Sequence, residues 1–189
     1  MSLDLTESRQ TSKGLGVFAQ RDLPKGTLVY SEDRDESERR VYTRDEIAAF
    51  CPEQVRRLNF FGVCLGEEQV VIESYLIPWV DMMVENIPYE NAPDNGMFFN
   101  HSCNPNLVWA SDITLVTWKD VAAGDELTYD YGTEDVNVAS FRCKCMETQC
   151  RGDIGGEEWQ SLQHVYGRNF RESVLKKIDA SAASDAASN

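Results

Sequence analysis

Long apolar runs are missing from this sequence. No stretch approaches the roughly 18 consecutive apolar residues that a membrane-spanning helix needs, and the N-terminus, polar and mixed in charge, lacks the apolar centre of a signal peptide. We therefore expect a soluble, intracellular protein without a membrane partner. In a reducing compartment its six cysteines are expected to be thiols or metal ligands rather than disulfides.

Basic residues are scarce. The chain has 18 Lys and Arg against 32 Asp and Glu, which gives a formal net charge of −14 at pH 7. Nucleic-acid binding rests on basic contacts to phosphate, so this balance argues against direct binding of nucleic acid. The acidic chain would attract a basic peptide, although charge alone favours the simpler interpretation that acidity keeps the protein soluble.

The length leaves room for one main domain and an appendage, because 189 residues with 42% hydrophobic content can bury one substantial core. Gly155-Gly156 marks a boundary. Beyond it, apolar residues recur every three or four positions over residues 159–178, which predicts one amphipathic helix weakened by Gly167. We expect this helix to pack back on the domain rather than to bind a partner, and residues 180–189 to form a frayed tail.

Short strand-forming segments separated by turn residues predict mainly β-structure. Residues 14–19 and 27–30 flank a Pro-Lys-Gly turn and predict a hairpin. Residues 63–72 predict two strands around a turn, and residues 107–118 a strand pair broken near Ser111. Residues 126–131 predict one further strand that ends at Gly132.

Helix signals are few and short. Thr43 followed by Glu46 is a possible capping box, which predicts a short helix from that point. Pro52 suits the first turn of a second short helix. Three prolines over residues 75–93 exclude a long helix there.

Two segments carry most of the candidate chemistry: residues 100–106, with the sequence NHSCNPN, and residues 125–132, with the sequence DELTYDYG. The first is dense in small polar residues and contains a proline, so it cannot hold a regular helix or strand. It is either an ordered binding loop or a surface turn, and composition alone favours the turn.

Two further segments complete a recognisable order: the glycine-bearing residues 13–26 near the N-terminus and the cysteine-bearing residues 141–152. Together the four segments, covering residues 12–32 and 96–153, resemble SET-domain protein-lysine methyltransferases with a cysteine-rich post-SET tail. The resemblance implies a mainly β fold with short helices, the SET (β-clip) fold, in which the first signature motif crosses the second in a knot-like way. It also implies a SET domain over residues 1–137 with a variable insert at 33–95, a post-SET zinc segment at 138–155, and a C-terminal helix and flexible tail at 156–189.

A zinc site is incomplete in the tail alone. Cys143, Cys145 and Cys150 supply three thiolates, one fewer than a tetrahedral structural site requires, and their spacing differs from the common Cys-x2-Cys knuckle. On spacing alone, metal binding and its absence are about equally favoured. The resemblance supplies Cys103 of the first signature segment as the fourth ligand of a structural zinc.

The resemblance implies S-adenosylmethionine as the methyl donor and places its binding on the glycine segment, the signature segment and an aromatic residue of the tail. Gly14 and Gly16 leave the backbone open to close approach by a ligand, although the same glycines could mark a β-bulge. His101 is expected to position the signature loop rather than to bind metal, and His164 to lie on the surface. The expected cofactor-binding residues are Lys13, Gly14, Leu15, Gly16, Asn100, His101, Tyr131 and Phe141.

A lysine amine has a reference pKa of about 10.4 and is protonated at neutral pH, so an apolar channel that desolvates the cation would make its lone pair available. Phe99, Trp109 and Tyr129 are candidates for lining such a channel, and ordinary aromatic core is the alternative for Trp109. By resemblance Tyr131 is the catalytic tyrosine, and Tyr129 occupies a position where relatives carry Tyr or Phe. A Tyr at that position tends to accompany lower methylation states.

The preferred hypothesis is an S-adenosylmethionine-dependent methyltransferase acting on a lysine of a basic protein, a histone tail being the expected substrate. It would work in the nucleus of a eukaryote and otherwise in the cytoplasm. The alternative is a catalytically inactive, zinc-stabilised SET-like module that only binds a peptide. A zinc hydrolase is disfavoured because four thiolates leave no open position for water.

Overall fold

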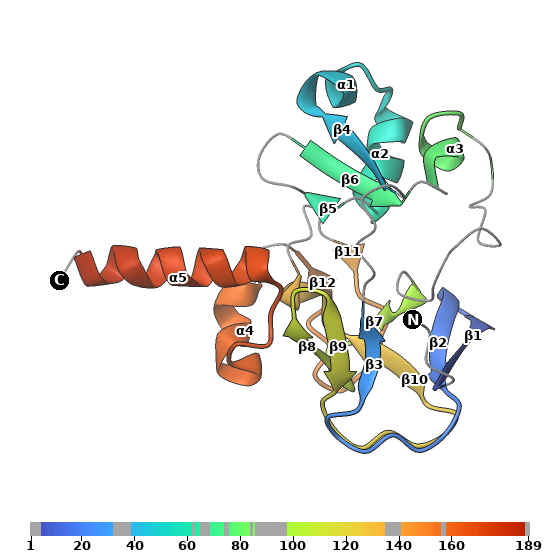
Figure 1. The fold of residues 1–189 in the computed structure, drawn as a ribbon, viewed down its shortest axis with the longest axis vertical. Helices are drawn as coiled ribbons and strands as arrows, with labels where there is room; N and C mark the ends of the chain where they lie inside the picture. The colour runs from blue at the N-terminus through green and yellow to red at the C-terminus, as the bar shows by residue number, and fades with distance from the viewer. Residues whose placement is uncertain are drawn as a thin grey trace. The chain divides into compact units, whose positions relative to one another are not determined.

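The part of the chain that the structure describes is mainly β-structure with short helices (Figure 1). The structure is a computed structural model, and it describes residues 5–31, 39–61, 63–64, 69–73, 76–83, 85, 98–134, 141–155 and 158–187. The chain divides into two compact units. The first comprises Met1–Asp33, Asn95–Asp135 and Ala139–Asn189, and the second comprises Arg34–Asp94 and Val136–Val138. Among the described residues, no helix combines the length and the apolar character that crossing a bilayer requires.

The described residues of the first unit form two larger sheets and one small one. A four-stranded sheet has the order β1-β2-β10-β7 and is formed by β1 (Thr6–Thr11), β2 (Gly14–Ala19), β10 (Glu126–Tyr129) and β7 (Asn100–His101). A three-stranded sheet has the order β3-β9-β8 and is formed by β3 (Leu28–Ser31), β9 (Thr114–Thr117) and β8 (Leu107–Ser111). The tail forms a two-stranded sheet of β11 (Phe141–Arg142) and β12 (Asp153–Ile154).

The predicted hairpin between residues 14–19 and 27–30 is wrong, because these strands belong to different sheets. β2 pairs with β1 and β10, whereas β3 pairs with β9. The Pro-Lys-Gly turn is held instead by distant residues, since Leu23 bridges Val121 and the Gly26 N–H donates to the Thr117 carbonyl over 2.8 Å. Turn residues predict where the chain bends, but packing against distant segments determines which strands pair. The predicted strand pair in residues 107–118 is confirmed as β8 and β9, with an irregularity between Trp109 and Ser111.

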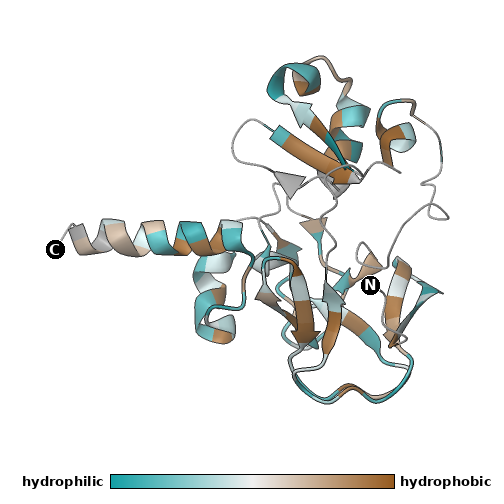
Figure 2. Ribbon diagram, in the orientation of Figure 1, coloured by the Kyte–Doolittle hydropathy of each residue, from teal (hydrophilic) through white to brown (hydrophobic). Residues whose placement is uncertain are grey.

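The second unit follows its local signals. The capping box of Thr43 and Glu46 starts α1 (Arg44–Ala48), and α2 (Pro52–Phe61) begins at its proline, as predicted. β5 (Val63–Cys64) pairs with β6 (Gln69–Glu73), which also pairs with β4 (Arg39–Thr43), and the hydrophobic residues of β6 are evident in Figure 2. A short helix α3 (Ile77–Val80) completes the described part of this unit.

The C-terminal segment forms two helices, so the single predicted helix is wrong. α4 (Trp159–Tyr166) ends at Gly167, whose φ of +60° lies in the left-handed region that glycine adopts at low cost, and α5 (Glu172–Ala187) follows. The predicted apolar stripe is buried as expected, in a cluster with Val108 of β8 (Trp159, Leu162, Tyr166, Phe170, Val174 and Ile178). The predicted frayed tail is helical as far as Ala187, which its alanines favour intrinsically.

Candidate active site and cysteine cluster

Residues 100–106 form an ordered segment rather than a surface turn, and the expectation that no strand forms here is wrong for its first two residues, Asn100–His101, which are β7. β7 runs parallel to β10, with Asn100 opposite Thr128 and His101 opposite Tyr129. The side chain of Asn106 fixes the next turn, because its amide donates to the Glu126 carbonyl over 2.8 Å and accepts the Thr128 N–H over 2.8 Å. The two signature segments are therefore bonded to each other along their length.

The glycine segment lies directly against this pair. A Cβ at Gly16 would stand 2.7 Å from Glu126 Oε1 and 3.0 Å from Asn100 Nδ2, so only glycine fits without displacing them. Asn100 Nδ2 donates to the Leu15 carbonyl over 3.1 Å and to Glu126 Oε1 over 2.7 Å, while Lys13 Nζ lies 3.2 Å from Glu126 Oε2. The structure thus brings Lys13, Leu15, Gly16 and Asn100 together around Glu126, a residue that sequence reasoning missed.

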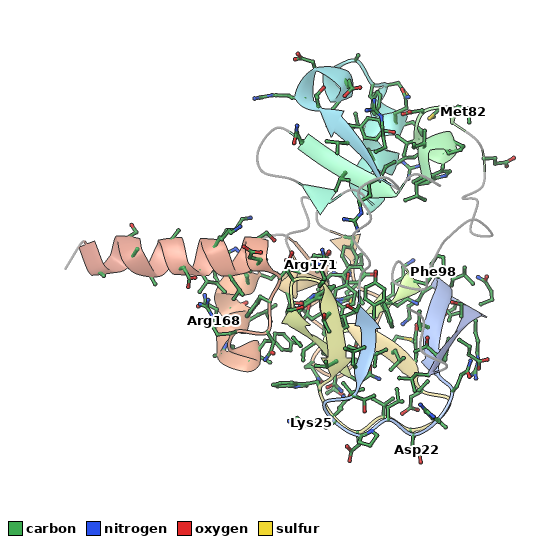
Figure 3. All side chains as sticks on the ribbon, viewed as in Figure 1. Asp22, Lys25, Met82, Phe98, Arg168 and Arg171 are labelled. Carbon is green, nitrogen blue, oxygen red and sulfur yellow. The ribbon has the colours of Figure 1, made fainter. Side chains whose placement is uncertain are left out.

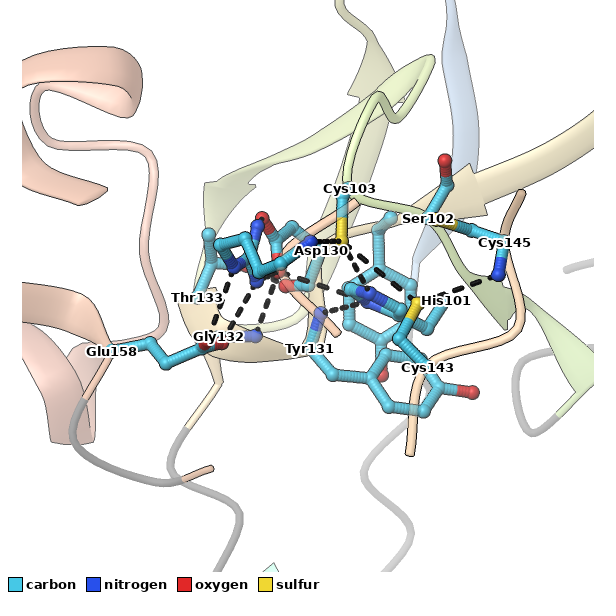
Figure 4. Close-up of polar contacts among 12 residues, drawn as sticks. His101, Ser102, Cys103, Asp130, Tyr131, Gly132, Thr133, Cys143, Cys145 and Glu158 are labelled. Carbon is cyan, nitrogen blue, oxygen red and sulfur yellow. Dashed lines mark hydrogen bonds and ion pairs between the residues drawn. The ribbon is translucent and has the colours of Figure 1, made fainter. Parts of the chain in front are cut away.

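His101 connects the tyrosine segment to the cysteines. Its Nδ1 accepts the Tyr131 N–H over 3.2 Å, and its Nε2 lies 3.3 Å from Cys103 Sγ (Figure 4). Burial lowers the pKa of His101 to about 4, and this effect outweighs the opposing influence of Asp130. The ring is therefore neutral at pH 7 with its proton on Nε2, where it donates to the sulfur. The imidazole thus links the Tyr131 backbone to Cys103 of the signature segment.

Aromatic rings surround the end of β10. Tyr129 and Tyr131 have ring centroids 4.8 Å apart, and Trp109 lies 5.4 Å from Tyr129 in an edge-on arrangement. Phe141 of the tail lies 5.8 Å from His101 and 5.9 Å from Tyr131. Ring contacts thus join Trp109 and Tyr129 of the predicted channel to the cofactor residues His101, Tyr131 and Phe141. The ring of Phe99 instead contacts Tyr30, which sequence reasoning missed, at 5.7 Å.

The two tyrosines reach this arrangement differently from the prediction. β10 ends at Tyr129, and Tyr131 begins a short 3₁₀ helix, Tyr131–Thr133, so they do not share one strand face. Asp130 stops the strand because its carboxylate accepts the Gly132 N–H over 3.0 Å and caps the new helix. The rings still lie side by side because the tight turn returns Tyr131 toward His101.

Both tyrosine hydroxyls donate to neighbours. Tyr131 donates to the Phe99 carbonyl over 2.8 Å, and Tyr129 donates to Glu134 Oε2 over 2.5 Å. Desolvation by burial, reinforced by Glu134, raises the pKa of each phenol above its ordinary value. Neither tyrosine is ionised at neutral pH, so each can orient a reacting group by hydrogen bonding but cannot serve as a strong base.

The four predicted zinc ligands converge. The Sγ atoms of Cys103, Cys143, Cys145 and Cys150 all lie within 4.8 Å of one another, with 3.9 Å between those of Cys103 and Cys143. A tetrahedral zinc site with Zn–S bonds of about 2.3 Å requires sulfur atoms about 3.8 Å apart. Burial raises the pKa of Cys103 to about 11, so a cation would have to displace that thiol's proton on binding. The donor set fits a structural zinc.

A buried ion-pair network, which sequence reasoning missed, surrounds Asp130, the residue between the two tyrosines. Asp130 is 1% exposed and receives two hydrogen bonds of 2.7 Å from the Arg151 guanidinium and one of 3.0 Å from the Tyr166 hydroxyl. Arg151 also donates to Glu158 over 2.8 Å and 3.1 Å. Because Arg151 directly follows Cys150, this network couples the tyrosines to the cysteine cluster and to α4.

Comparison with known proteins agrees with this geometry. Residues 14–132 match the SET domain family. The chain is 29% identical over 175 residues to the histone-lysine N-methyltransferase SETD2 of Homo sapiens, covering 87% of this chain and 6% of that protein. It is 28% identical over 172 residues to the H3 lysine-36 specific histone-lysine N-methyltransferase of Schizosaccharomyces pombe, covering 86% of this chain and 19% of that protein. The chain thus spans only a small part of these curated relatives. Since the family match extends over more than half of its length, the chain belongs to the SET domain family.

Proposed function

We propose that this protein transfers methyl groups from S-adenosylmethionine to a lysine of a basic protein, with a histone as the substrate. The observation that carries the proposal is the pair of adjacent tyrosines, Tyr129 and Tyr131, enclosed by aromatic rings and bonded to the signature segment. Membership of the SET domain family and relatives named histone-lysine N-methyltransferases support it. The net charge of −14 favours a basic partner, and with a histone substrate a eukaryotic protein would act in the nucleus.

The aromatic cluster would prepare the amine for transfer. Phe99, Trp109 and Tyr129 would surround the lysine side chain with apolar surface, which disfavours the ammonium and exposes the nitrogen lone pair. S-adenosylmethionine, when bound, supplies a methyl group on a positively charged sulfur. Backbone oxygens and the Tyr131 hydroxyl would align that methyl with the lone pair through weak C–H···O contacts.

The cofactor would lie between the glycine segment and the signature segment. We assign its binding to Lys13, Gly14, Leu15, Gly16, Asn100, His101, Tyr131 and Phe141. Asn100 has a supporting role as well, because its side-chain amide holds the Leu15 carbonyl and Glu126 in place. The tail residue Phe141, next to His101 and Tyr131, would cover the adenine.

Methyl transfer is tested directly by incubating the purified chain with S-adenosylmethionine and core histones and measuring mass gains of one methyl group. We expect transfer to histone H3, with peptides containing lysine-36 as the first to try because relatives carry that name. In calorimetric titration, Asn100→Ala is expected to bind S-adenosylmethionine at least about tenfold more weakly, since about 1.4 kcal/mol of lost contacts gives that factor. Cofactor binding without transfer to any histone would favour the alternative, a peptide-binding module that has lost catalysis.

A structural zinc held by Cys103, Cys143, Cys145 and Cys150 would tie the tail to the signature segment. We expect about one equivalent of zinc after chelator-free purification, because four thiolates complete a tetrahedral site. Cys143→Ser is expected to lose the metal, loosen the tail and weaken cofactor binding. Cys51→Ser is the matched control, since Cys51 is exposed and lies outside the cluster. Elemental analysis that finds less than about half an equivalent in the unchanged protein would contradict the assignment.

A further inference from the structure

Glu134 contacts the Tyr129 hydroxyl, and Arg171 contacts Glu134. The proposed mechanism gives neither residue a role. The Tyr129 hydroxyl donates to Glu134 Oε2 over 2.5 Å, and the other carboxylate oxygen lies 3.2 Å from Arg171 Nε. The side chains of Glu134 and Arg171 are only 11% and 12% exposed. The carboxylate therefore lies between a phenol hydroxyl that donates to it and a guanidinium with which it forms an ion pair, the contact at Nε lacking hydrogen-bond geometry.

Arg171 is itself fixed by two further contacts. Its guanidinium lies 4.2 Å from the centroid of the Trp109 ring, a cation–π distance, and its backbone N–H donates to the Thr133 carbonyl over 3.0 Å. Arg171 stands directly before α5, in the connection from α4 (Figure 3). The C-terminal helices pack on Val108 of β8 through their buried apolar residues. Their connection thereby places the positive charge of Arg171 next to the tyrosine site.

A phenol has one proton to donate and an oxygen that can still accept. When that proton is committed to Glu134, the oxygen of Tyr129 can only accept a hydrogen bond from whatever else approaches it. We propose that Glu134, clamped by Arg171, is a positioning residue that keeps the Tyr129 hydroxyl an acceptor toward the substrate amine; this inference rests on the proposed methyltransferase function.

The consequence concerns the nitrogen lone pair. A hydroxyl that accepts an amine N–H leaves the lone pair free and orients it, whereas a hydroxyl free to rotate can donate to the lone pair and block attack on the methyl carbon. Glu134 would thereby favour transfer to an amine that still carries an N–H. The C-terminal helices would then also contribute to catalysis, because Arg171, which pairs with Glu134, lies in the connection between them.

The kinetic test uses single-turnover methyl transfer to a histone peptide. We expect Glu134→Ala to slow the first transfer about three- to tenfold, the factor expected for one competing hydrogen bond, with little change in the reactant concentration that gives half the maximal single-turnover rate. Glu134→Gln should retain most of the rate, because its carboxamide oxygen can still accept from the phenol. Glu172→Gln, which removes an exposed carboxylate on α5, should leave the rate unchanged.

The decisive comparison is made in the Tyr129→Phe background, where no hydroxyl remains to be oriented. There, Glu134→Ala should have no further effect on the rate, whereas a purely structural role would slow both backgrounds equally. If Glu134→Ala fails to fold because Arg171 is left without its carboxylate, the Glu134→Ala/Arg171→Ala double variant removes both charges and takes its place. Equal slowing in the two backgrounds would overturn the inference.

A second readout separates this inference from the proposed function. The Tyr129 hydroxyl proton should give a slowly exchanging NMR resonance that disappears in Tyr129→Phe and in Glu134→Ala but survives in Glu172→Gln. This resonance requires no methyl transfer. Its presence in a protein without activity would refute the methyltransferase proposal while leaving the hydroxyl orientation established, and a Tyr129 resonance unaffected by Glu134→Ala would refute the orientation itself.

Discussion

Replacing Arg151 with methionine is expected to lower the free energy of unfolding by about 3–5 kcal/mol, which is the usual cost of leaving a buried charge without its partner. Asp130 is 1% exposed and would lose two hydrogen bonds of 2.7 Å from the guanidinium. The Tyr166 hydroxyl and the Gly132 N–H would remain as donors, but neither neutralises the carboxylate. Urea denaturation at constant zinc concentration measures the change.

Arg168→Met is the matched control for that experiment. Arg168 makes a similar two-bond pair with Asp179, but both side chains are 62% exposed, so the loss should be at most about 1 kcal/mol. The variant Arg151→Lys keeps the charge but lacks the planar guanidinium, so its loss in free energy of unfolding should lie between those of Arg151→Met and Arg168→Met. A loss for Arg151→Met no larger than that for Arg168→Met would show that water or a rearranged side chain compensates Asp130.

Grouping in the chain made three cysteines and two tyrosines conspicuous in the sequence, but the fourth cysteine and the roles of the tyrosines came from the resemblance to SET-domain methyltransferases. Cys143, Cys145 and Cys150 lie close together in the chain, so only Cys103 had to be supplied from a distant segment. Tyr129 and Tyr131 are separated by one residue, and their rings meet in the structure where Asp130 ends the strand and caps a 3₁₀ helix. The strand assigned to them ended too late because the capping bond of Asp130 was not visible in a pattern of β-formers.

The charged supports of the site could not be predicted in the same way. The chain has 32 acidic and 18 basic residues, and nothing local distinguishes Asp130 or Glu134 from acids on a solvated face. Arg151, the partner of Asp130, lies 21 positions further along the chain. Arg171, the partner of Glu134, follows α4 in the sequence. Such pairs depend on tertiary placement, as does the pairing of β3 with β9, which local turn residues wrongly assigned to β2.

Tyr131→Phe is expected to lower the rate of methyl transfer about 100-fold or more, the usual effect of removing a group that orients the reacting atoms. In the structure its hydroxyl donates to the Phe99 carbonyl over 2.8 Å, and the ring packs between His101, Tyr129 and Phe141. The ring contacts survive the change to phenylalanine, so the variant should fold and bind S-adenosylmethionine. Single-turnover rates and calorimetric titration measure the two properties separately.

Tyr129→Phe is the paired variant, since it removes the hydroxyl of the neighbouring ring, whose centroid lies 4.8 Å from that of Tyr131, and leaves the bond from Tyr131 to the Phe99 carbonyl intact. We expect the unchanged protein to yield mainly mono- or dimethyl-lysine, because the Tyr129 oxygen occupies space that a partly methylated amine needs in order to turn and present its lone pair again. Phenylalanine opens that space, so activity should be kept and the products should shift toward higher methylation states. Mass spectra of the products measure both the extent of methylation and the ratio of methylation states. Near-normal turnover by Tyr131→Phe would remove the catalytic role of Tyr131. An unchanged product ratio for Tyr129→Phe would show that the Tyr129 hydroxyl does not limit methylation.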